Sequence, residues 1–86
     1  AAVLEAMDAE TFTSGKLGVL HAAAVAGQFE VVQVKEVLDR LTFGDDKVDA
    51  AVILYPRVVD PGAWTTIYAA FTFESDKKAL RERLGH

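Results

Sequence analysis

A short signature occurs three times along this chain, and it restricts the possible folds more than any other feature. Thr-Phe is followed by one variable residue, a Ser or Asp, one further residue and a Lys, at residues 11–16, 42–47 and 72–77. The copies are about 30 residues apart, a period typical of proteins that stack one supersecondary unit repeatedly. The sequence therefore predicts a repeated structural unit.

Each copy of the signature indicates a joint between two helices. Ser14, Asp45 and Ser75 are residue types that accept hydrogen bonds from the free amides of a first helical turn. We therefore expect these three residues to cap the helices that follow them. The structural residues of the joints are Phe12, Ser14, Lys16, Phe43, Asp45, Lys47, Phe73, Ser75 and Lys77.

Apolar residues between the joints recur at helical spacing. Four sets are each predicted to face inward from one helix: Leu17, Leu20, Ala24 and Val25; Val34, Val37, Leu38 and Leu41; Trp64, Ile67, Tyr68 and Phe71; and Leu80 with Leu84. Pro56 should end or kink the helix before it, and Asp60-Pro61 is a strong helix start. Glu30 is expected to begin another helix, although Glu is a poor capping residue.

These signals predict an all-α fold of about six short helices. The helices would form repeated antiparallel hairpins in a short α-solenoid-like array, with residues 1–86 as one domain. A compact six-helix bundle of the death-domain type is the alternative. The apolar runs at 29–34 and 50–55 also permit strands, but the flanking caps and the repeat register favour helix.

Composition excludes several classes of function. The net charge is −4 and cysteine is absent, so neither a phosphate-tracking basic surface nor a thiolate site is expected. The longest apolar run, 50–55, is far short of the roughly 20 residues that span a bilayer. We expect a soluble chain that, because it begins with Ala, is a piece of a longer protein.

No group of residues in the sequence predicts catalysis. His21, placed on the apolar face of its helix, is expected to be a partly buried structural histidine, and His86 is terminal. Asp45, Asp46 and Asp49 lack the spacing of a calcium loop and are better explained by the helix dipole. The tyrosines, Trp64 and the phenylalanines are predicted to be core. We expect no enzyme activity, metal or cofactor.

The three joint lysines are unusual, because a cation in the first helical turn faces the positive end of the helix dipole. We expect Lys16, Lys47 and Lys77 to fold back onto carbonyls at the C-terminus of the preceding helix, tying each joint together. The functional alternative is a row of cations that binds an anionic partner.

The chain resembles the family catalogued as domain of unknown function 4476. The likeness lies in the three joint signatures, in Gln33-Val34 after Phe29, and in Leu54-Tyr55-Pro56 leading to Val59-Asp60-Pro61. The family occurs in many bacterial proteins and near the start of an animal proline- and serine-rich protein. The resemblance implies a helical domain in varied architectures and carries no catalytic residues across.

Helical hairpins present extended surfaces that typically serve protein recognition. We therefore expect a non-catalytic interaction or scaffold module, whose partner is a protein segment or a neighbouring domain of its own chain. Small-molecule or lipid binding between alanine-rich helices is the alternative. The polar positions expected at a contact surface are Gln28, Lys35, Arg40 and Arg57.

Overall fold

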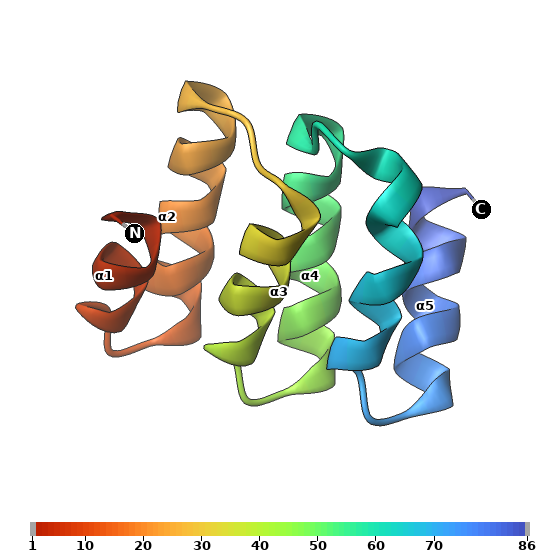
Figure 1. The fold of residues 1–86 in the computed structure, drawn as a ribbon. Coiled ribbons are helices and arrows are strands. Elements are labelled where there is room, and N and C mark those ends of the chain that lie inside the picture. Colours follow the sequence, from red (N-terminus) through yellow and green to blue (C-terminus); the bar gives the residue numbers. More distant parts are fainter. Residues whose placement is uncertain (1, 86) are drawn as a thin grey trace.

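A computed structural model describes residues 2–85, and most of these residues lie in helices (Figure 1). The elements are the α-helices α1 (Ala2–Asp8), α2 (Thr13–Ala26), α3 (Val31–Asp39), α4 (Gly44–Leu54) and α5 (Glu74–Leu84), with 3-10 helices η1 (Tyr55–Arg57) and η2 (Pro61–Ala70). Helix makes up 77% of the structure. The prediction of an all-α fold with about six helices is confirmed, and strands at 29–34 and 50–55 are excluded. His86 lies outside the described residues.

The helices form two rows, which the chain visits alternately. One row holds α1, α3 and η2, and the other holds α2, α4 and α5 (Figure 1). Helix α4 packs between α2 and α5, while α3 packs against both η2 and α4. The molecule measures 30 × 25 × 18 Å. The arrangement of the helices as a repeated array of hairpins stays a prediction.

The core lies between the two rows and follows the apolar periodicity closely. The inward-facing residues of α3 and the loop after it, Val34, Val37, Leu38 and Leu41, are all buried, as are Trp64, Ile67, Phe71 and Leu80. One residue departs from the pattern. Val25, predicted to face inward, is 79% exposed, because it lies on the outer face of α2 and α4, which no third row of helices covers.

The helix starts differ from the predicted caps. Helices α2, α4 and α5 begin with the phenylalanine of each signature at the N-cap, and no side chain caps them. The backbone carbonyls of Phe12, Phe43 and Phe73 each accept an intrahelical hydrogen bond. The donor is the backbone amide of the joint lysine four residues later. Ser14, Asp45 and Ser75 therefore lie in the first turn, and the prediction that they cap their helices is wrong. Of these three residues, only Asp45 carries a negative charge, which the positive end of the helix dipole favours.

At the opposite end of the helices, two loops pair with each other. The Phe29 amide donates to the Arg57 carbonyl at 2.8 Å, and the Val59 amide donates to the Phe29 carbonyl at 2.9 Å. Asp60 precedes η2 as predicted, but its carboxylate caps a different helix by accepting the Val31 amide of α3 at 2.8 Å. This side-chain bond joins α3 to the start of η2, two elements about 30 residues apart.

Helix α3 also gains a cap from within its own first turn. The Gln33 side-chain oxygen accepts the Glu30 amide at 2.8 Å, and Glu30 and Gln33 together form a capping box at the start of α3. Pro56 ends α4 as predicted, because the chain passes at Tyr55 into the short 3-10 turn η1.

Candidate interaction surface

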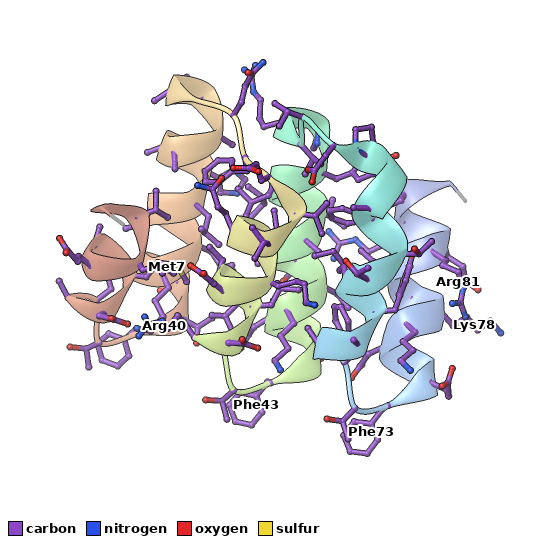
Figure 2. The ribbon with its side chains drawn as sticks, in the orientation of Figure 1. Met7, Arg40, Phe43, Phe73, Lys78 and Arg81 are labelled. Carbon is purple, nitrogen blue, oxygen red and sulfur yellow. The ribbon has the colours of Figure 1, made fainter. Side chains whose placement is uncertain are left out.

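Three phenylalanines that the sequence assigned to the core lie instead in solvent. Phe12, Phe43 and Phe73 are 74%, 68% and 65% exposed. Figure 2 shows Phe43 and Phe73 pointing away from the helices on neighbouring loops, and the loop that carries Phe12 lies at the same edge of the molecule. We call residues 10–16, 41–47 and 71–77 the phenylalanine edge. Large apolar side chains gathered in this way on a folded surface commonly mark a site of interaction.

Two of the three loops are anchored in the core just before the exposed phenylalanine. Phe43 and Phe73 are in extended conformation, with ψ angles of 144° and 137°. Residues two positions apart in a regular extended strand would share a side. The residues two positions earlier, Leu41 and Phe71, are nevertheless 6% and 5% exposed and anchor their loops in the core. The chain therefore turns between the buried anchor and the exposed phenylalanine that begins the next helix.

Two of the three joint lysines bind backbone carbonyls of other helices. Lys16 donates to the Met7 carbonyl in the last turn of α1 at 2.7 Å, as predicted. Lys47 donates instead to the Ala70 carbonyl at 3.0 Å, which is the end of η2 and not of the preceding helix. Lys77 donates to the Glu74 side chain at 3.1 Å. The predicted acceptor is thus wrong for the second and third lysines.

Further contacts join the three loops into one edge. Arg40, beside the second loop, pairs with Asp8, beside the first, at 3.0 Å. The Asp76 carboxylate of the third loop lies so close to Gly44 of the second that a Cβ there would collide with it. Together with the Lys47 bond to η2, these contacts restrict movement of each loop relative to its neighbour.

Replacing Lys47 with Met is expected to lower the free energy of unfolding by about 1–2 kcal/mol. The substitution removes the partly buried ammonium group, so the Ala70 carbonyl loses its charged hydrogen-bond donor. In a domain this small, each kcal/mol of lost stability lowers the melting temperature by about 4–8 °C. Lys78→Met is the matched control, because its side chain is 74% exposed. Equal melting temperatures for the two variants would remove any stabilising role for the Lys47 bond.

The polar residues predicted as a contact surface do not gather in one place. Gln28 and Arg57 lie in or beside the paired loops at one end of the helices, whereas Arg40 lies at the phenylalanine edge in its pair with Asp8. Lys35 is partly buried on α3. Of the four, only Arg40 lies beside the exposed phenylalanines, and the role of the set stays a prediction.

A hollow of about 580 Å³ lies on the outer face of α2 and α4, away from that edge. Its lining is mainly apolar, with Leu17, Val25, Val52 and Ile53 among its residues. His21 opens onto this hollow and is exposed, so the prediction of a partly buried histidine is wrong. The cause is the same incomplete cover of α2 that exposes Val25.

Other features bear on the range of possible chemistry. Within residues 2–85, no cluster of three or more His, Asp or Glu side chains is arranged to hold a metal ion. None of the helices described is both long enough and apolar enough to cross a membrane.

Comparison with known proteins adds a family assignment. The family model described as "Domain of unknown function (DUF4476)" matches residues 1–84, nearly the whole chain. Searches with this chain found no match among the curated proteins or the solved structures.

Proposed function

Because this chain belongs to the DUF4476 family, whose description names no activity, we propose from its own surface that it is a non-catalytic protein-interaction module. The docking surface would be the phenylalanine edge. The observation that carries this proposal is the set of three phenylalanines, each at least 65% exposed, on adjacent loops of one edge. The partner would be a protein segment or a neighbouring domain of the same parent chain.

The energetics of the edge suit docking. Fully burying an exposed phenylalanine is worth about 1.5–3 kcal/mol, so three can supply much of the free energy of a specific complex. The loops that carry them are cross-linked by Lys16, Lys47 and the Asp8–Arg40 pair. Ordered loops lose little conformational entropy on binding, so more of the burial energy becomes affinity.

We further propose that the three hairpins are copies of one repeated unit. The three signatures support this, because each places an exposed phenylalanine at an N-cap and a lysine in the following turn. The paired loops support it as well, since Phe29-Glu30-Val31 and Val59-Asp60-Pro61 occupy corresponding positions about 30 residues apart. Such a stack would present its loops as a row, which is the arrangement that a linear partner segment can follow.

The experiment is affinity capture with three forms of the domain: wild type, a variant with Phe12, Phe43 and Phe73 replaced by Ser, and a control with Val25, Val32 and Val59 replaced by Ser. The three valines are 79%, 56% and 52% exposed, so the control removes a comparable amount of exposed apolar surface elsewhere. Partner proteins should be retained by the wild type and the valine variant and lost by the phenylalanine variant. Retention by all three forms would contradict the proposal.

A second candidate, small-molecule or lipid binding, is favoured by the hollow on α2 and α4. Its apolar lining and its volume of about 580 Å³ suit a small ligand with an apolar chain. Titration with a long-chain fatty acid tests it directly. Saturable binding that is lost on Ile53→Gln would support this candidate, whereas no saturable binding would remove it.

A further inference from the structure

Acidic residues stand close in sequence to the exposed phenylalanine of every joint. The acidic residues of the phenylalanine edge are Glu10, Asp45, Asp46, Glu74 and Asp76, and its cations are Lys16, Lys47 and Lys77. Each phenylalanine therefore has a carboxylate within two positions of it in sequence. The edge is acidic overall, in keeping with the net charge of −4.

The hydrogen bonds of the edge make its outer surface more acidic than this composition suggests. Lys16 and Lys47 direct their ammonium groups inward to backbone carbonyls, and both side chains are partly buried. Lys77 pairs with Glu74. Among residues 2–85, the carboxylates of Glu10, Asp45, Asp46 and Asp76 make no ion pair. The exposed carboxylates of Glu10 and Asp45 and the partly buried ones of Asp46 and Asp76 therefore leave negative charge at the edge that no side-chain cation in the described part of the chain neutralises.

We propose that the partner of the phenylalanine edge is a cationic amphipathic protein segment, with apolar side chains on one face and Lys or Arg beside them. This inference rests on the docking role proposed above. The apolar face would cover Phe12, Phe43 and Phe73, and the flanking cations would pair with the free carboxylates. Lysine and arginine also bind favourably against the faces of aromatic rings.

Charge also separates this partner from other occupants of an apolar edge. An anionic membrane or a nucleic acid would be repelled by the unpaired carboxylates, and so would the same acidic edge of a second copy. A cationic segment is attracted at a distance and then held by apolar contact. Association should therefore be faster and tighter at low ionic strength.

The test uses two synthetic peptides of about four helical turns, each with a leucine stripe at i, i+3, i+4 and i+7. One carries lysine beside the stripe and the other carries glutamate. By isothermal titration at low salt, the lysine peptide should bind the domain at least about 10-fold more tightly than the glutamate peptide. The preference should shrink as salt is raised.

Matched variants connect this binding to the edge. Replacing Phe12, Phe43 and Phe73 by Ser should weaken the lysine peptide about 10-fold or more, and Asp45→Asn with Asp46→Asn should weaken it several-fold. Glu5→Gln with Glu36→Gln is the control of equal charge, since both residues are exposed on helices outside the edge. Its affinity should stay within about twofold of wild type at the same salt.

Three outcomes would overturn the inference. These are equal binding of the two peptides, lysine-peptide binding that ignores the phenylalanine substitutions, and phenylalanine-dependent binding to anionic vesicles or to a second copy instead. The docking proposal fails separately, because it falls only if captured partners ignore the phenylalanine substitutions. A captured partner that depends on the edge but carries an acidic segment would end this inference and leave the docking proposal standing.

Discussion

Replacing Phe71 with Ala is expected to lower the free energy of unfolding by about 3–5 kcal/mol, whereas the same change at Phe73 should alter it by less than about 0.5 kcal/mol. The two residues have the same side chain and are two positions apart. Phe71 is 5% exposed and closes the core at the end of η2, while Phe73 is 65% exposed. The difference arises from burial alone.

Urea unfolding followed by far-ultraviolet circular dichroism measures both values. A domain of this size has a total stability of about 5–10 kcal/mol, so Phe71→Ala should lose a large fraction of it. If Phe73→Ala lost as much as Phe71→Ala, the exposed position of Phe73 would be wrong, and the docking surface would lose one of its three anchors.

Replacing Phe43 with Ala is expected to weaken binding of an edge-dependent partner by about 10- to 100-fold without lowering the melting temperature. Phe43 belongs to the middle loop of the three, and the residues that dominate binding energy cluster near the centre of an interface. Phe12 and Phe73 lie on the flanking loops, so their single substitutions should cost less affinity. Titration calorimetry with the captured partner measures all three.

The control for this prediction is Val32→Ala, because Val32 is 56% exposed on α3, outside the edge. Its affinity should equal that of the wild type. An equal loss in the Phe43 and Val32 variants would show that exposed apolar area in general, and not the edge, determines binding.

The helical fold could be predicted from the sequence because most of its signals are local. The spacing of Val34, Val37 and Leu38 depends only on helical periodicity, and all three residues are buried. Pro56 ends α4 because its missing amide acts on its own helix. Such features can be predicted without knowing which helices pack against each other.

The acceptors of long-range hydrogen bonds could not be predicted. Nothing near Lys47 in sequence indicates Ala70, and nothing near Asp60 indicates the Val31 amide. The first bond joins α4 to the end of η2 and the second joins α3 to the residue before η2, so both depend on tertiary packing. The exposure of His21 and Val25 has the same origin, because it follows from the lack of a neighbour on one side of α2.

The candidate surface was missed for a different reason. Aromatic residues in a helical domain are commonly core, but Phe12, Phe43 and Phe73 lie outside the helical periodicities of their neighbours. Each of them stands at the N-cap of a helix, where the structure leaves the side chain exposed. Their place in the joints, outside the helical stripes, was the signal in the sequence.

We propose that this domain binds its partner through the phenylalanine edge. Amide chemical shifts of the isotopically labelled domain, recorded as captured partner is added, test it most directly. We expect the largest changes at residues 10–16, 41–47 and 71–77. Changes confined to the hollow on α2 and α4, with the edge unaffected, would contradict the claim.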